Sequence, residues 1–233
     1  MNYIVDINTM KQFSTRAEKY ITKLKKSKEW TCDKETVIEY FESQEFSVFK
    51  PLVRFQVRYS GLELSIDDNE EEMFSLRLFS NEEIKDKEPL DYFEENGNYW
   101  FDCGIHARAQ FNFYINQIGE VCAESGGDIN IIYSSIEMMI EKYALIDSLS
   151  NWHKDVYYYN IQNVEKFNTL VVQEKFRPIQ ECCDEYLKCI TNGSVTIIQG
   201  TWLDKPEFYL HIYSDNEVKT KQFVERLKKE KIL

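Results

Sequence analysis

The hydrophobic pattern of the chain changes period at Ser60 and Gly61. Before this point, apolar residues recur mostly every three or four positions, which is the spacing of an amphipathic helix. After it, Leu62, Leu64 and Ile66 alternate with polar residues, which is the period of a half-buried strand. A chain that carries both periods must pack helices against a sheet, so we expect an α+β fold.

Three helices are expected before the change of period. The first covers residues 9–26, with lysines toward its C-terminal end, where cations favour the helix dipole. The second covers residues 34–45, and the side chain of Asp33 can cap its first turn. The third covers residues 51–59, because Pro51 suits a first turn and the glycine that follows can end a helix.

Short strands are expected from Leu62 to residue 123. Residues 62–66 and 73–79 have the pattern of an antiparallel hairpin, with a polar turn at residues 67–72. Residues 81–98 are charged and irregular, and we expect one helical turn in them, near residues 90–93. Further strands are expected at residues 99–103, 111–115 and 118–123.

A longer helix should begin after Ser134 or Ser135, either of which can act as its N-cap, and continue to Leu149. The apolar residues within it are spaced so that they form one stripe, which predicts that this stripe is buried. The residues of the stripe are Ile136, Met139, Ile140, Tyr143, Ala144 and Leu149.

Residues 151–233 are expected to extend the same sheet. A strand is expected at residues 156–159, and a hairpin should pair residues 194–202 with residues 208–213. Helices are expected at residues 164–172, 178–189 and 215–231. The last of these helices should bury Val218, Phe223 and Leu227.

The composition is that of a folded protein. Hydrophobic residues make up 43% of the chain, and it has only eight Gly and four Pro, which excludes the disordered class. No internal repeat or low-complexity linker divides it. We therefore expect one globular unit, with an amphipathic helix in residues 1–30, a core at residues 31–150 and an extension at residues 151–233.

The net charge of −12 is unevenly spread. Between Glu63 and Glu95 there are thirteen Asp or Glu residues and three Lys or Arg residues, which is a local balance of −10. A field of this sign disfavours nucleic-acid binding and favours a cationic protein partner. The alternative is a solvated acidic face that keeps the protein soluble. No membrane span and no secretory signal is expected, so we expect a cytoplasmic protein.

The residues that could carry chemistry do not form a recognisable site. The six cysteines lack framework spacing, so we expect reduced thiols and no disulfides. Cys103 and His106 could form a thiol hydrolase pair, but near neighbours on a strand seldom align for proton transfer. Cys103 with His106 or Cys122 supplies only two of the four ligands of a zinc site. We therefore predict no catalytic residue, no metal and no cofactor.

Aromatic residues are expected on both faces of the predicted strands. Core packing explains most of them, but Tyr and Trp on an outward face supply much of the energy of protein interfaces. Together with the acidic run, this gives a set of candidate partner-binding residues. They are Asp67, Asp68, Glu70, Glu71, Glu72, Glu82, Glu83, Trp100 and Tyr157.

Three features occur together in residues 33–149. A helix ends in a turn at Tyr59-Ser60-Gly61, a strand follows at residues 118–123, and a Ser-capped helix covers residues 134–149. Together they resemble the core of the SUKH superfamily of bacterial toxin-immunity and cell-wall-regulator-like domains. Members commonly have Gly-Gly where this chain has Ser60-Gly61. The resemblance implies an α+β fold with a mixed, mainly antiparallel sheet and helices packed around it.

The resemblance also implies a function. It implies an immunity protein that binds a cognate toxin effector and blocks it, often by covering the active site of a nuclease or another cytotoxic enzyme. The alternatives are a regulatory or scaffolding domain without a toxin partner and an unrecognised enzyme. The identity of the toxin and the oligomeric state stay open at this point.

Overall fold

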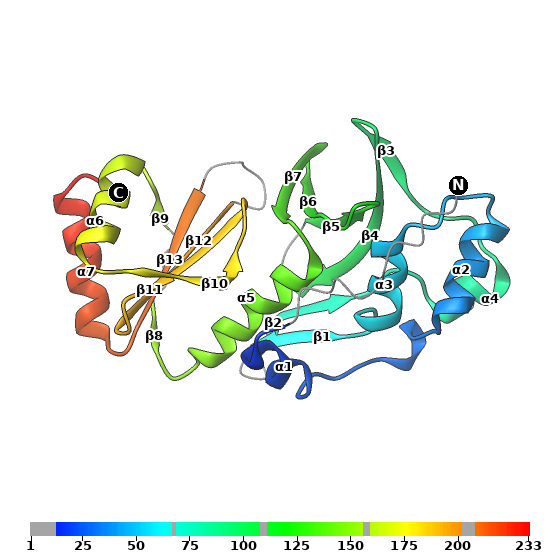
Figure 1. The fold of residues 1–233 in the computed structure, drawn as a ribbon, viewed down its shortest axis with the longest axis horizontal. Coiled ribbons are helices and arrows are strands. Elements are labelled where there is room, and N and C mark those ends of the chain that lie inside the picture. The colour runs from blue at the N-terminus through cyan, green and yellow to red at the C-terminus, as the bar shows by residue number, and fades with distance from the viewer. Residues whose placement is uncertain (1–12, 67–68, 108–110, 156–158, 202–207) are drawn as a thin grey trace.

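The computed structural model describes residues 13–66, 69–107, 111–155, 159–201 and 208–233 (Figure 1). It contains two antiparallel sheets and seven α-helices in the described residues, which confirms the α+β class. We call residues 13–150 the N-terminal lobe and residues 151–233 the C-terminal lobe. No helix in the described part of the chain combines the length and the apolarity that crossing a bilayer requires.

Helices open the N-terminal lobe. They are α1 Thr15–Ile21, the 3₁₀ turn η1 Lys28–Trp30, α2 Lys34–Ser43, α3 Lys50–Arg58 and, later, α4 Asn81–Asp86. Asp33 caps α2 as predicted, accepting a hydrogen bond from the amide of Thr36 at 2.9 Å. Helix α1 ends earlier than predicted, because the lysine-rich chain after it bonds to the first sheet. The amide of Glu63 donates to the carbonyl of Lys25 at 3.1 Å.

The turn at Gly61 separates the helices from the sheet, as the change of period predicts. Gly61 has φ +87°, a left-handed conformation that favours glycine. A Cβ atom there would lie 2.5 Å from the carbonyl oxygen of Ser27, so the turn has no room for a side chain. The neighbouring Ser60 is fully buried, and its hydroxyl accepts a hydrogen bond from the amide of Leu78 at 3.1 Å.

The first sheet has the order β1-β2-β4-β5-β6-β7, and β3 pairs with β4 beside this path. Its strands are β1 Glu63–Ile66, β2 Asn69–Leu76, β3 Phe93–Glu95, β4 Asn98–His106, β5 Asn112–Asn116, β6 Val121–Ser125 and β7 Asp128–Tyr133. The predicted hairpin at residues 62–79 is confirmed, although β2 begins at Asn69, inside the predicted polar turn. The last predicted strand begins at Val121 instead of Ile118, because Asn116 holds a turn by accepting bonds from three successive amides.

The segment at residues 81–98 is more regular than predicted. The helical turn lies at α4, where Ser80 and Glu83 form a reciprocal capping box, and the expected turn near residues 90–93 is wrong. Residues 93–95 form β3 instead, because Asn96 and Gly97 adopt left-handed conformations and reverse the chain into β4.

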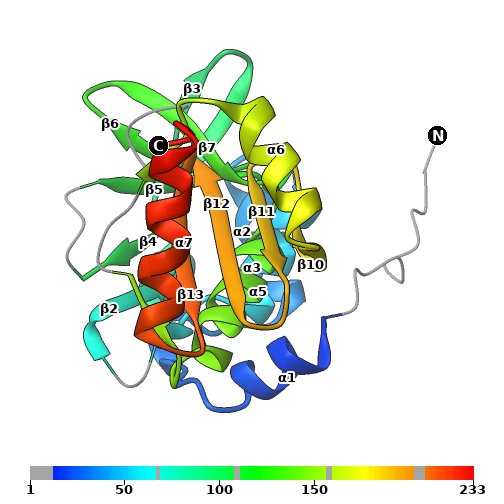
Figure 2. The same cartoon turned by 90° about the vertical axis from the view of Figure 1, so that its left-hand side faces the viewer.

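The C-terminal strands form a second sheet, so the expectation that they extend the first one is wrong. The order is β10-β11-β12-β13-β8, with β9 paired to β13. The elements are β8 His153–Lys154, β9 Tyr159–Asn160, α6 Val164–Gln173, β10 Arg177–Cys183, β11 Leu187–Thr191, β12 Val195–Thr201, β13 Phe208–Ser214 and α7 Glu217–Lys229. Helices α6 and α7 lie on one face of this sheet (Figure 2). The predicted hairpin is confirmed, as are the helices predicted at residues 164–172 and 215–231. Residues 156–158 of the strand predicted at residues 156–159 lie outside the described residues.

Two expectations for the C-terminal lobe are wrong. Residues 178–189 form the β10–β11 hairpin and not a helix, because Asp184 fixes a tight turn between the strands. Its Oδ1 accepts hydrogen bonds from the amides of Tyr186 at 2.8 Å and Leu187 at 2.6 Å. On α7, Phe223 and Leu227 are buried as predicted, but Val218 is 62% exposed.

Helix α5 (Ile136–Ser148) lies between the two sheets (Figure 1). Ser135 caps it, and all six residues of the predicted stripe are buried. Nine of its thirteen residues are buried, including Glu137 and Glu141, because α1 and the first sheet pack on it from one side and β10 from the other. The main core therefore continues into the second sheet, through Cys182, Leu187, Cys189, Ile198 and Tyr213.

Polar contacts also join the lobes. The carboxylate of Asp184 accepts hydrogen bonds from the hydroxyl of Ser134 at 2.6 Å and from its amide at 3.1 Å. The guanidinium of Arg16 lies 3.3 Å from Glu181, and the ammonium of Lys142 lies 3.3 Å from the hydroxyl of Tyr209. A second, separate core lies beneath α6 and α7, and its fully buried members include Leu170, Ile197, Leu210, Ile212, Leu227 and Ile232.

Candidate protein-binding surface

The structure describes the side chains of three of the nine candidate partner-binding residues, namely Glu82, Glu83 and Trp100. Asp67, Asp68 and Tyr157 lie outside the described residues, and Glu70, Glu71 and Glu72 are described only by their backbone, which belongs to β2. Glu82 is exposed in the first turn of α4. Glu83 is half-buried and accepts a hydrogen bond from the amide of Ser80 at 2.6 Å, so its carboxylate is engaged in capping the helix.

Trp100 is 3% exposed, so the expectation that its ring faces outward is wrong. Strand β3 places Phe93 directly opposite Trp100, and the ring of Phe93 meets that of Tyr114 with centroids 4.9 Å apart. This side of the sheet is thus covered by its own aromatic residues. The indole Nε1 of Trp100 has no hydrogen-bond partner among the described residues.

A different set of rings reaches the surface after the end of α2. Helix α2 lies at the opposite end of the molecule from α6 and α7 (Figure 1). The ring of Phe46 lies 4.9 Å from that of Tyr92 and 5.1 Å from that of Tyr99. Phe49 packs on Phe46 at 5.7 Å, and its ring is 6.0 Å from that of Tyr99. We call Phe46, Phe49, Tyr92 and Tyr99 the aromatic patch. Tyr92 is 41% exposed and the other three are partly exposed.

The C-terminal end of α2 positions Phe46 in this patch. Glu45 takes a left-handed conformation with φ +53°. The amide of Phe46 then donates to the carbonyl of Phe41 at 3.1 Å, and the amide of Glu45 donates to that of Glu42 at 3.0 Å. This is the Schellman arrangement, and the ring of Phe46 stacks on that of Phe41, as the motif favours. The patch is therefore anchored to the core on one side and open on the other.

Two exposed apolar side chains border the patch. Val48, which lies between Phe46 and Phe49 in the sequence, is 37% exposed. Ile118, in the turn between β5 and β6, is 63% exposed. The side-chain oxygen of Gln117 accepts a hydrogen bond from the amide of Tyr99 at 2.8 Å, which holds this turn against the patch.

Exposed carboxylates flank the patch in the sequence and are close to it in the fold. We call Glu42, Glu45, Asp91 and Glu94 the acidic border, and all four are exposed. Residues 33–50 and 80–99, which build this end of the lobe, contain twelve Asp or Glu residues and four Lys or Arg residues. Across the chain, residues 1–150 contain 28 acidic and 16 basic residues, whereas residues 151–233 contain twelve of each. The net charge of −12 thus lies wholly in residues 1–150.

Cys103 and His106, the residues considered for catalysis, both lie on β4. The thiol of Cys103 is fully buried in the core, and burial raises its pKa well above the usual range, so that it stays protonated at neutral pH. His106 lies across the strand pair from Phe74, with ring centroids 6.4 Å apart. All six cysteines are free thiols. The described residues contain no group of three or more side chains that could hold a metal ion.

The sequence prediction of an outward-facing aromatic residue is wrong for Trp100 and untested for Tyr157, and it missed the aromatic patch. The run Phe46-Ser47-Val48-Phe49, between two predicted helices, was a signal for it, because an apolar run in a connection must either be buried or form a surface patch. Tyr92 lies in a segment that was predicted to be irregular, so no sequence signal indicated its part in the patch. Comparison of the chain with protein-family models, with curated proteins and with solved structures finds no match.

Proposed function

We propose that this protein is an immunity protein that binds a cognate bacterial toxin through the aromatic patch and the acidic border. The observation that carries the proposal is the partly exposed ring cluster around Phe46 and Tyr92, surrounded by uncompensated carboxylates. Protein interfaces commonly combine buried aromatic anchors with a polar rim that excludes water. Here the anchors are already packed on the core, so binding costs little ordering entropy.

The charge of the same lobe fits a basic partner. An acidic surface accelerates association with a cationic protein through electrostatic steering. Enzymes that cleave nucleic acids have positively charged substrate sites, which an acidic surface complements. Blocking such a site requires no catalytic residue, metal or cofactor in the inhibitor. We therefore propose a cytoplasmic, non-enzymatic inhibitor, whose toxin is to be sought among basic nucleases encoded with it.

The test is co-expression of the protein with candidate toxin domains, followed by measurement of growth and of complex formation. We expect rescue of growth together with a stable complex. In the variant Tyr92→Ala we expect binding to weaken roughly thirtyfold or more, since an anchor residue contributes about 2 kcal/mol or more. The matched control is Phe208→Ala in the C-terminal lobe, because Phe208 is 37% exposed and Tyr92 is 41% exposed.

The outcomes separate the alternatives. Rescue of growth without physical association would contradict the proposal. A complex that depends on Tyr92 but gives no protection would favour a regulatory or scaffolding domain that uses the same surface. Equal effects of Tyr92→Ala and Phe208→Ala would place the interface elsewhere.

A further inference from the structure

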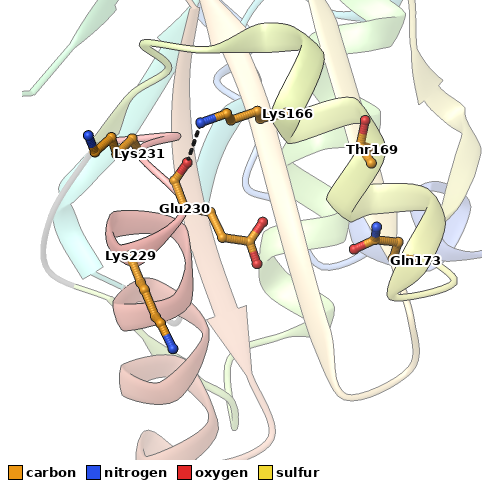
Figure 3. Close-up of a pocket in the computed structure, with 6 residues that line it drawn as sticks. All are labelled: Lys166, Thr169, Gln173, Lys229, Glu230 and Lys231. Atoms are coloured by element: carbon orange, nitrogen blue, oxygen red, sulfur yellow. Dashed lines mark hydrogen bonds between the residues drawn. The ribbon is translucent and has the colours of Figure 1, made fainter.

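A groove of about 420 Å³ lies between α6 and α7 in the C-terminal lobe. It is lined by Lys166, Thr169, Gln173, Lys229, Glu230 and Lys231 (Figure 3). This volume falls within the range of about 300–1,000 Å³ that small-molecule sites occupy. Every lining side chain is polar or charged, so the groove does not favour an apolar ligand.

The groove carries an excess of positive charge. Its single carboxylate, that of Glu230, is paired with the guanidinium of Arg226 at 2.9 Å, and Arg226 also contacts Glu174. Among the described residues, no carboxylate pairs with Lys229 or Lys231. These two ammonium groups are exposed, and their charges are uncompensated in a chain whose net charge is −12.

The position of Lys166 is not explained by the stability of its helix. Lysines at the C-terminal end of a helix favour the dipole, which accounts for Lys229. Lys166 lies in the first turn of α6, where the dipole disfavours a cation. Its ammonium group donates to the main-chain oxygen of Glu230 at 3.1 Å, which orients the side chain across the groove without neutralising its charge (Figure 3).

We propose that this groove binds a small phosphorylated molecule. Lys166, Lys229 and Lys231 supply the charge that phosphate groups require, since ammonium groups bind phosphate as point charges. The hydroxyl of Thr169 donates to the carbonyl of Glu165 at 3.0 Å and can still accept a hydrogen bond from a hydroxyl group of the same ligand, and Gln173 offers an amide that can donate or accept. No aromatic side chain lines the groove, so recognition rests on phosphate and hydroxyl groups. The site is independent of the toxin-binding surface and lies in the other lobe.

The test uses inorganic pyrophosphate as the probe, titrated into the full-length protein and followed by two-dimensional NMR and calorimetry. We expect saturable binding, with shifts confined to α6 and α7. The variant with Lys166→Ala, Lys229→Ala and Lys231→Ala should bind roughly tenfold or more weakly, because each lost charged hydrogen bond weakens binding. The matched control replaces Lys154, Lys175 and Lys188, which are exposed in the same lobe and do not line the groove, and should bind like the parent.

A second variant distinguishes a binding role from a structural one. Glu230→Gln removes the negative charge from the groove while Arg226 keeps its contact with Glu174, so pyrophosphate should bind roughly twofold or more tightly. Non-saturating shifts, or equal affinity of the groove variant and its lysine control, would overturn the proposal. Binding to vesicles that contain phosphatidylserine, without saturable binding of pyrophosphate, would overturn it in favour of a membrane surface.

Discussion

The N-terminal lobe carries the whole net charge of the chain, whereas the C-terminal lobe carries none. Both are antiparallel sheets covered by helices, so the difference is not a consequence of architecture. In the C-terminal lobe, acidic side chains are paired at short range, as in Asp215 with Lys219 at 2.7 Å and Glu217 with Lys221 at 2.6 Å. The acidic border of the N-terminal lobe has no such partners among the described residues.

The difference in net charge between the two lobes indicates which of their features folding requires. Self-repulsion between like charges destabilises a compact state, so an uncompensated acidic surface opposes folding. The C-terminal lobe shows that the same chain can build a comparable sheet-and-helix layer with balanced charge. The acidic surface of the N-terminal lobe is therefore better explained by a function than by stability.

The largest expected effect tests whether the lobes are separable. Ile140 lies on α5 in the core shared by both sheets, and Leu170 lies in the core beneath α6 and α7, and both are fully buried. Replacing either with alanine should lower the free energy of unfolding by about 2–5 kcal/mol. Hydrogen exchange should then accelerate in both sheets for Ile140→Ala, but first in the second sheet for Leu170→Ala. If each variant accelerates exchange in one sheet and leaves the other sheet unchanged, the two lobes unfold independently.

Acid should destabilise the protein through His211 in the C-terminal lobe. His211 is 4% exposed, and burial, aided by the charge of Lys154, lowers its pKa to about 3. Its Nε2 must donate to the carbonyl of Asp155, 3.0 Å away, since a carbonyl only accepts. The unfolded state binds a proton near pH 6.5 and the folded state does not. Stability contributed by the neutral ring is therefore complete above about pH 6.5 and is lost as the pH falls toward 3, by up to about 1.4 kcal/mol per unit.

The measurement is the free energy of unfolding in denaturant between pH 7 and pH 4. His211→Gln should flatten this pH dependence, because glutamine does not titrate. His153→Gln, at a half-buried histidine of the same lobe, serves as the control for the loss of an imidazole. A parent slope that His211→Gln does not change would show that other groups cause the acid sensitivity.

The fold could be predicted from the sequence where a local signal decided the structure. Asp33 and Ser135 mark helix starts, and Gly61 marks the change from helix to strand, because caps and left-handed turns depend on a few adjacent residues. The β10–β11 hairpin could not, since Cys182 and Cys189 are apolar in either a helix or a strand. The separation into two sheets depends on α5 being covered on two sides, which no local pattern encodes.

For the candidate surface, the structure tests the predicted exposure of Trp100 but not that of Tyr157. An outward-facing Trp100 was expected, but it is buried because β3, which was not predicted, pairs beside it. Exposure of a ring depends on which strand lies next to it, and this is a non-local property. Phe46 reaches the surface through a left-handed Glu45, a conformation uncommon for residues other than glycine.

Neutralising the acidic border should change the rate of association with a toxin more than the stability of the complex. The triple variant Glu42→Gln, Asp91→Asn and Glu94→Gln should slow association with a basic toxin roughly tenfold at low salt, while dissociation changes little. The control is Glu165→Gln, Glu185→Gln and Glu225→Gln, which removes three exposed carboxylates from the C-terminal lobe. Stopped-flow measurements across a salt series give the association rate of each triple variant. If the two triple variants associate at equal rates, the charge difference between the lobes is no longer evidence for a function of the acidic border.

The smallest expected effect concerns the acidic run at the β1–β2 hairpin. Neutralising Asp67, Asp68, Glu70, Glu71 and Glu72 together should slow association and weaken its salt dependence, because steering depends on the summed field of the lobe. We expect thermal stability to change little, since a run of like charges forms no ion pair within itself. The same association series and a thermal melt measure both quantities. If this variant binds and protects like the parent at every salt concentration, the run is a solvated face, and the steering charge of the N-terminal lobe lies at the acidic border alone.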